Sequence, residues 1–150
     1  MRAVVQRVTS ASVSVDGQVI GAIDQGYMVL LGIAAEDKPE DLKYICDKVY
    51  NLRVFEDQEG RMNKSLADVG GNILLISQFT LMGDARKGRR PGFDGAMRPD
   101  EATKVYQDAI RYFKDTYGLE VQVGQFGADM KVQLINDGPC TILLDSTKIL

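Results

Sequence analysis

Hydroxyl side chains and a run of cations stand close together in residues 77–93, SQFTLMGDARKGRRPGF. Ser77 and Thr80 open this segment as candidate nucleophiles. The cations that follow them are Arg86, Lys87, Arg89 and Arg90. Hydroxyls beside a basic loop indicate hydrolysis of a phosphorylated or nucleic-acid-like substrate. The chain has no histidine, so no Ser-His-Asp or Cys-His arrangement can form and another group must handle the proton.

The same residues also have a purely structural interpretation. On a strand, Gln78 and Thr80 would share one face while Ser77 and Phe79 would share the other, because side chains alternate. Ser77 and Thr80 would then be polar residues at the end of a strand, and the basic loop would be an ordinary solvated loop. Spacing alone leaves both interpretations open.

Residues 136–141, NDGPCT, are a second unusual stretch. Asp137-Gly138 is a turn dipeptide, and Pro139 cannot donate a hydrogen bond to a β-ladder. These residue types predict a plain hairpin turn between two strands. A cis Gly138-Pro139 bond is the alternative, because proline lowers the cost of that geometry.

Other familiar sites are missing from the sequence. It contains no HExxH zinc motif, no GxxxxGK[ST] phosphate loop and no GxGxxG fingerprint. A solvated loop accounts for Glu56, Asp57 and Glu59 around Gly60, so we expect no metal there and no cofactor. We interpret Cys140 as a small buried thiol rather than a nucleophile.

Composition limits the class of protein. The 150 residues are 45% hydrophobic and 26% charged, which fits one globular domain over residues 1–150. The net charge of −3 argues against a protein that coats nucleic acid, so any such contact must be local. We expect a cytoplasmic protein that does not associate with membranes, because no apolar run nears the ~20 residues of a membrane span, no signal-peptide pattern is present and no cysteine framework exists.

The elements that must position these residues are strands and two helices. Residues 12–23 predict a hairpin turning at Asp16-Gly17. Apolar runs predict buried strands, and further strands follow the second helix. The buried strands are residues 26–35 and 72–81, and the later ones are residues 119–123, 130–135 and 140–146.

Helical periodicity marks residues 37–55 and 99–118. We expect Asp37 as the N-cap of the first helix, with Glu40 completing a capping box, and Gly118 at the end of the second. The expected inner faces are Leu42, Ile45, Cys46, Val49 and Leu52 on the first helix, and Ala102, Val105, Tyr106, Ala109 and Phe113 on the second. The fold class is therefore α+β, with a mostly antiparallel sheet and two main helices.

Two motifs together resemble a known family. SQFTL at 77–81 and NDGPCT at 136–141 are similar to the SQFT and NxGPxT signatures of the D-aminoacyl-tRNA deacylases. The likeness extends along the chain through residues 1–17, the KGxRP pattern at 87–91 and GADM at 127–130. Cys140 and Gly92 depart from the usual pattern, where a larger apolar residue and a serine are common.

The resemblance implies a compact, barrel-like fold that works as a homodimer with active sites at the subunit interface. It implies cofactor-free hydrolysis of the ester in D-aminoacyl-tRNA, and in mischarged glycyl-tRNA, with the acceptor end as the bound part. The implied catalytic residues are Ser77, Gln78, Phe79 and Thr80. Those implied for substrate binding and chiral selection are Gly138, Pro139, Arg7 and Met130. Those implied for tRNA binding are Arg86, Lys87, Arg89 and Arg90.

The resemblance also implies how chirality is read without a histidine. Gly138-Pro139 is expected to be cis, held by Arg7, and to project into the pocket of the other subunit, where an L side chain would collide with it. The 2′-OH of the terminal adenosine is expected to assist with the proton. Thr80 then positions the substrate, with a nucleophilic Thr80 as the alternative.

Two other classes of function remain open. A noncatalytic RNA-binding module would explain the missing catalytic side chains, although such modules normally show stacking aromatics or a broad basic face. A hydrolase of small D-amino-acid esters would not need the basic loop. Salt dependence separates it from a tRNA enzyme.

Overall fold

One long strand, β1 (Arg2–Val15), organises the sheet of this computed structural model, which describes residues 1–150. β1 pairs antiparallel with β3 (Gly26–Gly32) along its first half and with β2 (Gln18–Ile23) along its second. β8 (Lys131–Asp145) runs antiparallel to β1 over nearly its whole length.

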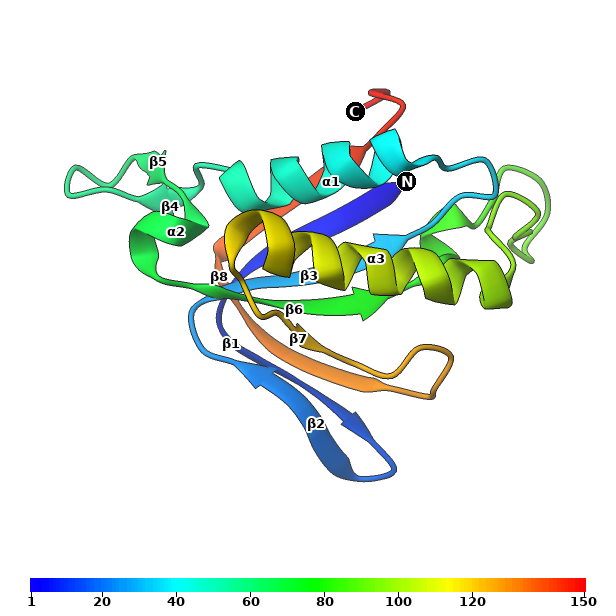
Figure 1. The fold of residues 1–150 in the computed structure, drawn as a ribbon, viewed down its shortest axis with the longest axis horizontal. Helices are drawn as coiled ribbons and strands as arrows, with labels where there is room; N and C mark the ends of the chain where they lie inside the picture. The colour runs from blue at the N-terminus through cyan, green and yellow to red at the C-terminus, as the bar shows by residue number, and fades with distance from the viewer.

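The rest of the sheet continues from β3. β6 (Asn72–Ser77) pairs with β3 in parallel, and β7 (Gln122–Val123) pairs with β6 in parallel. The sheet is therefore mixed, and in Figure 1 it curls so that β2, β7 and the first half of β8 form a second wall. The predicted α+β fold with two main helices is confirmed.

The hairpin between β1 and β2 forms where the sequence predicts it. Val15 pairs with Gln18 across Asp16 and Gly17, whose φ angles are 51° and 78°. Two consecutive left-handed residues give the turn twist that suits a two-residue hairpin.

The two main helices cover one face of the sheet. α1 (Pro39–Asn51) and α3 (Pro99–Tyr117) lie side by side there (Figure 1). The predicted inner faces are largely confirmed: Leu42, Ile45, Cys46, Val49, Ala102, Tyr106, Ala109 and Phe113 are buried. Leu52 and Val105 are partly buried against the same core. Gly118 ends α3 in the left-handed conformation, as predicted.

The opposite face of the sheet has its own smaller core. Val8, Val13, Met28, Leu74 and Ile76 are buried there. The curled wall supplies Met130, Val132 and Leu134 to this core. The remaining elements are the small sheet of β4 (Phe55–Glu56) and β5 (Met62–Lys64) and the short helix α2 (Leu66–Val69).

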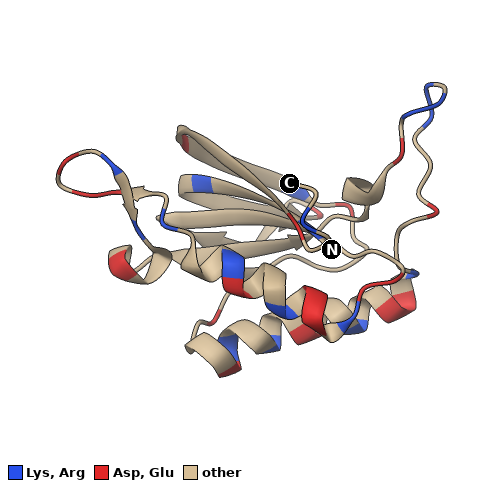
Figure 2. Ribbon diagram, turned by 90° about the horizontal axis from the view of Figure 1, so that it is seen from above, with Lys and Arg blue, Asp and Glu red and all other residues tan.

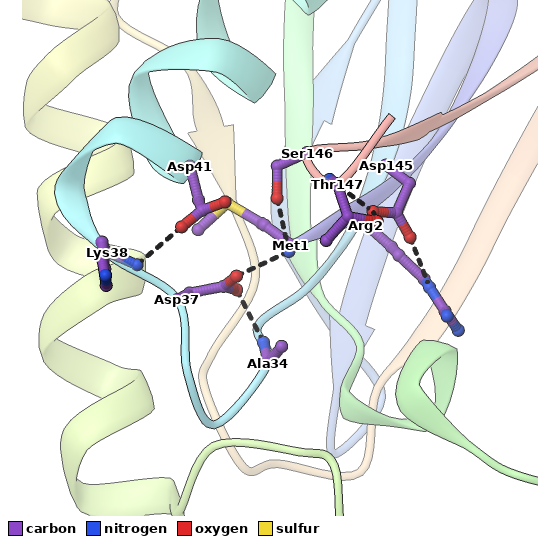
Figure 3. A network of polar contacts seen from close by, with 9 residues as sticks. All are labelled: Met1, Arg2, Ala34, Asp37, Lys38, Asp41, Asp145, Ser146 and Thr147. Atoms are coloured by element: carbon purple, nitrogen blue, oxygen red, sulfur yellow. Dashed lines mark hydrogen bonds and ion pairs between the residues drawn. The ribbon is translucent and has the colours of Figure 1, made fainter. Parts of the chain in front are cut away.

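The predicted start of α1 is wrong by one residue. Lys38 is the N-cap, and its amide N–H donates to the carboxylate of Asp41 at 2.8 Å. Asp37 instead accepts hydrogen bonds from the amino group of Met1 and from the Ala34 amide, both at 2.7 Å (Figure 3). A buried amino group needs a charge partner. Pairing the Met1 amino group therefore stabilises the fold more than a helix cap at Asp37 would.

The predicted hairpin at residues 136–141 is also wrong. β8 does not reverse direction, because Asn136 pairs with Val8 and Thr141 pairs with Gln6 on the same neighbouring strand. Residues 137–140 bulge out opposite Arg7. β1 is long enough to pair with both halves of β8, so a turn dipeptide is accommodated as a bulge.

The strand predicted over residues 72–81 ends early, at Ser77. A 3₁₀ helix, η1 (Phe79–Met82), follows it. The alternating faces expected for residues 77–80 therefore do not exist. Gly32 permits this turn, because a Cβ added there would lie 2.8 Å from the Cβ of Leu81. None of the helices combines the length and the apolar character that a membrane span requires.

Candidate active site

A hollow of about 590 Å³ opens where β3 and β6 end. Ser77, Gln78 and Phe79 line one side of it. The start of α3 and residues 126–130 line other parts of its wall, and most of its lining is hydrophobic. The predicted site residue Met130 lies in this wall too. The fold therefore brings together residues of the SQFT and GADM segments from distant parts of the sequence.

The link between β6 and η1 positions the SQFT side chains. Ser77 pairs with Leu31 at the end of the parallel ladder, and the Gln78 amide donates to the Leu31 carbonyl at 2.8 Å. The chain then turns into η1, which leaves Phe79 58% exposed at the mouth of the hollow. Thr80 is exposed, and the side-chain amide of Gln78 donates a hydrogen bond to its hydroxyl. A hydroxyl engaged in this way is held in place.

Phe79 and Thr80 open η1, so their amide N–H groups have no acceptor inside that helix. Such groups at the edge of a hollow can bind developing negative charge on an ester oxygen. This is the electrostatic feature of the site that ester hydrolysis would use.

Only two titratable side chains line the hollow, Arg98 and Asp129. Asp129 is paired with Lys131 at 3.0 Å, and both side chains are largely exposed. Sequence reasoning missed Asp129, although it stands within the GADM motif. It is the one carboxylate that lines the hollow, and it is therefore the one side chain there that could act as a general base. No group of three or more Cys, Asp or Glu side chains could hold a metal ion.

Gly138 and Pro139 do not lie in this hollow. Both are exposed at the bulge of β8, and the bond between them is cis, as the resemblance implies. Arg7 is buried beneath them and donates from Nε to the Asp137 carbonyl at 3.0 Å. The bulge is also fixed by Asn136, whose side chain accepts from the Cys140 amide at 2.7 Å.

The sheet register separates the bulge from the hollow. Arg7, opposite the bulge, pairs with Tyr27 of β3, and Tyr27 in turn pairs with Ile73 near the start of β6. Ser77 lies at the other end of β6. With about 3.3 Å per residue along a strand and 4.8 Å between strands, the two regions lie roughly 20 Å apart. Within one chain, the predicted catalytic residues are brought together with Met130 but not with Arg7, Gly138 and Pro139.

The basic loop, residues 83–95, extends away from the body of the molecule, with its cations at the tip (Figure 2). An isolated bridge between Asp84 and Gly92 closes its base. Arg86 is already engaged, because its guanidinium donates to both carboxylate oxygens of Asp84, at 2.9 and 2.7 Å. These hydrogen bonds lower the pKa of Asp84 to about 2. The loop cations without an ion pair in the chain are Lys87, Arg89 and Arg90.

Aromatic walls of the hollow were missed by sequence reasoning. Phe93 follows the cations within the basic loop and packs edge-on against Phe79, with ring centroids 5.1 Å apart. Phe126 lines the hollow beside the predicted GADM segment. The position of Phe93 just after the cations was a usable signal, whereas nothing in the spacing singles out Phe126.

Comparisons with known proteins match nearly the whole chain. The model of a family described as D-Tyr-tRNA(Tyr) deacylase matches residues 4–145. A D-aminoacyl-tRNA deacylase of Clostridium beijerinckii (strain ATCC 51743 / NCIMB 8052) is 59% identical over 148 residues, which cover 99% of each chain. A solved structure described as c-Myc DNA Unwinding Element Binding Protein is 46% identical, with a TM-score of 0.92 over 97% of this chain and 98% of that one. A probable eukaryotic D-amino acid tRNA deacylase is 18% identical, with a TM-score of 0.82 over 96% and 98% of the two chains, and shares the fold.

Proposed function

This chain belongs to the D-Tyr-tRNA(Tyr) deacylase family and is a D-aminoacyl-tRNA deacylase, and on that premise we propose how its site works. The acceptor end of D-aminoacyl-tRNA, or of mischarged glycyl-tRNA, enters the hollow beside Ser77, Gln78 and Phe79. Water then cleaves the ester to release the amino acid and tRNA. The observation that carries this proposal is the largely apolar hollow with the open amino end of η1 at its edge.

Two copies of the chain are needed to complete each site. The exposed Gly138-Pro139 bulge lies roughly 20 Å from the hollow of its own chain, which is too far to contact a substrate bound there. In a homodimer, the bulge of one subunit enters the hollow of the other. Its backbone leaves no room for an L side chain, while a D side chain or glycine is accepted.

The substrate itself assists with the proton. An aminoacyl ester is activated, and the neighbouring 2′-OH of the terminal adenosine can help to orient water. The amide groups of Phe79 and Thr80 stabilise charge on the ester oxygen, a contribution that is large in other acyl-transfer sites. Thr80, held by Gln78, positions the substrate. We place this reaction in the cytoplasm, where aminoacyl-tRNA is used.

The first experiment compares hydrolysis of D-tyrosyl-tRNA and L-tyrosyl-tRNA, with EDTA present, and repeats it with a terminal 2′-deoxyadenosine. We expect cleavage of the D form alone, insensitive to EDTA and lost with the deoxy end. D-specific cleavage of the substrate with the terminal 2′-deoxyadenosine would show that a group of the protein handles the proton. The variant Asp129→Asn would then show whether that group is the Asp129 carboxylate or Thr80. If neither ester is cleaved while tRNA still binds, the chain is a binding module.

A mixed dimer tests the shared site. Gln78→Ala damages the hollow and Gly138→Ala damages the bulge, so each homodimer should lose D-selective hydrolysis. A heterodimer of the two variants has one hollow and one bulge intact, and these meet in one of its two sites. We expect it to regain roughly half of the activity, as twofold symmetry requires. No recovery in the heterodimer would show that each chain builds its site alone.

A further inference from the structure

A second and larger hollow, about 1160 Å³, lies at the other end of η1. Met82 and Gly83 form its wall on the η1 side, and Lys87 and Arg90 of the basic loop line it as well. Arg2, from the start of β1, reaches the same hollow although it is remote in sequence from the loop. Neither the sequence motifs nor the family resemblance assigns a role to Arg2.

The Arg2 guanidinium is held rigidly. Its Nε donates to the carboxylate of Asp145 at 2.9 Å, and its Nη1 donates to the Leu81 carbonyl, in η1, at 3.0 Å. Asp145 is itself buried and accepts two hydrogen bonds from Thr147, from the amide at 2.8 Å and from the hydroxyl at 2.6 Å. Figure 3 shows Arg2 extending outward from this network.

This arrangement leaves donors free on Arg2. Nη2 has no acceptor within the chain, and the side chain is 41% exposed where it lines the hollow. A guanidinium presents its N–H groups in a fixed plane that matches the oxygens of a phosphate. Because Asp145 and Leu81 already fix the plane, little conformational entropy remains to be lost when an anion binds.

The other charges in the hollow favour an anion. Lys87 and Arg90 form no ion pair in the chain, and Asp84 is neutralised by Arg86. Asp94 is the one lining carboxylate without such a partner. The positively charged side chains therefore outnumber the negatively charged ones.

The two hollows lie at opposite ends of η1. η1 contains four residues, and at about 2 Å per residue its first and last residues lie roughly 6 Å apart along the helix axis. The catalytic hollow is lined by the first residue of η1 and the second hollow by the last. An RNA end whose terminal adenosine lies in the first hollow can therefore place its last phosphodiester in the second.

We infer that this hollow is a phosphate-binding subsite, in which Arg2, with Lys87 and Arg90, binds the phosphodiester that precedes the terminal adenosine of the substrate. This inference rests on the proposed function. It adds a contact to the RNA backbone that is the same in every tRNA, because a phosphate carries no sequence information.

The test compares two short esters, 3′-O-D-tyrosyl-adenosine and 3′-O-D-tyrosyl-cytidylyl-adenosine, which differ by one nucleotide and its phosphodiester. For the unmodified protein, we expect a KM roughly tenfold lower for the dinucleotide, as a charge-assisted contact to phosphate allows. Arg2→Met should remove most of this difference. Any disturbance of η1 in that variant affects both esters alike, so the change in the ratio of the two KM values reports the contact between Arg2 and the added nucleotide with its phosphodiester.

Two further variants serve as a second test of the phosphate contact and as its control. Arg90→Met, on the exposed loop, should reduce the ratio without risk to folding, whereas Arg111→Met, on the far surface of α3, should leave it unchanged. Equal KM values for both esters in the unmodified protein would overturn the inference, as would an unchanged ratio in Arg2→Met and Arg90→Met. Cleavage of D-tyrosyl-tRNA but of neither short ester would also count against it. Failure to cleave D-tyrosyl-tRNA at all would instead reject the proposed function.

Discussion

Arg7 Nε donates to the carbonyl oxygen of Asp137 at 3.0 Å, which joins the middle of β1 to the bulge of β8. The Nη1 of the same guanidinium donates to the Val54 carbonyl at 2.6 Å, in the segment after α1. Arg7 is 6% exposed, and the Asp137 carboxylate lies 3.8 Å from it. A buried cation with these partners fixes the bulge against the helical layer, since moving either partner would leave the charge unsatisfied.

Gly138→Ala should disrupt this arrangement. Gly138 has a φ of +133°, and a Cβ placed there would lie 2.9 Å from Arg7 Nη2, which cannot retreat without breaking its hydrogen bonds. We expect a loss of about 1–3 kcal/mol in the free energy of unfolding and loss of D-selective hydrolysis. Urea unfolding and hydrolysis of D-tyrosyl-tRNA measure the two effects.

The matched control is Gly60→Ala. Gly60 also has a positive φ, +76°, but a Cβ there meets nothing within 4 Å. It should show only the strain of the left-handed conformation, about 1 kcal/mol, with normal hydrolysis. If Gly138→Ala behaves like this control, the contact with Arg7 does not position the bulge.

Thr80→Val tests whether the hydroxyl is a nucleophile. The variant loses the acceptor for the Gln78 amide and keeps the shape of the side chain. If Thr80 only positions the substrate, single-turnover hydrolysis of D-tyrosyl-tRNA should slow by about tenfold or less. Thr116→Val, on the exposed surface of α3, is the control. Complete loss of activity with tRNA still bound, or an acylated Thr80 seen by mass spectrometry, would contradict the substrate-assisted mechanism.

Local sequence patterns predict the helices and the hairpin, because their determinants are local. The apolar period of α3 and the left-handed Gly118 are set within a few residues of each other. η1 could not be predicted in this way. The apolar run of β6 continues past Ser77, and the chain turns because the absence of a side chain at Gly32 lets η1 pack against β3.

In the candidate site, too, the residue types can be predicted from the sequence, whereas their positions in space cannot. The identities of Ser77 and Gly138 are conspicuous in the sequence, but their separation depends on the pairing of β8 with β1, which sequence periodicity does not reveal. Asp37 looks like a helix cap and serves instead as the partner of the Met1 amino group. Phe126 enters the hollow through tertiary packing alone.

The cations of the basic loop should differ in how much they contribute to tRNA binding. Lys87→Gln, Arg89→Gln and Arg90→Gln each remove a free charge, so each should reduce the slope of log K against log salt for tRNA binding by about 0.7. Arg86→Gln should reduce it much less, because that guanidinium already binds Asp84. Fluorescence anisotropy over a range of KCl concentrations measures the slope, with Lys104→Gln on α3 as the control. Slopes equal to that of the unmodified protein in all of these variants would show that the loop does not contact the RNA backbone.

Tyr106 should make stability depend on pH in the alkaline range. Its hydroxyl donates to the Leu75 carbonyl at 2.7 Å, and burial raises its pKa from 10.0 to about 12. The folded chain thus keeps this proton while the unfolded chain releases it, so the stabilisation is complete below pH 10 and falls between pH 10 and 12. The expected slope from this group is up to about 1.4 kcal/mol per pH unit. Burial also raises the pKa of the Cys46 thiol from 9.0 to about 12, so the unmodified protein should begin to lose stability near pH 9.

Tyr106→Phe isolates the tyrosine from the thiol. At pH 7 the variant should lose about 1 kcal/mol of unfolding free energy with the hydrogen bond to Leu75. Between pH 10 and 12 it should lose stability less steeply than the unmodified protein, because one of the groups that hold a proton in the folded state is gone. Urea unfolding at pH 7, 10 and 11 measures both effects, and Tyr44→Phe, whose hydroxyl has no partner in the chain, is the control. Parallel curves for Tyr106→Phe and the unmodified protein above pH 10 would show that Tyr106 ionises in the folded state as readily as in the unfolded one.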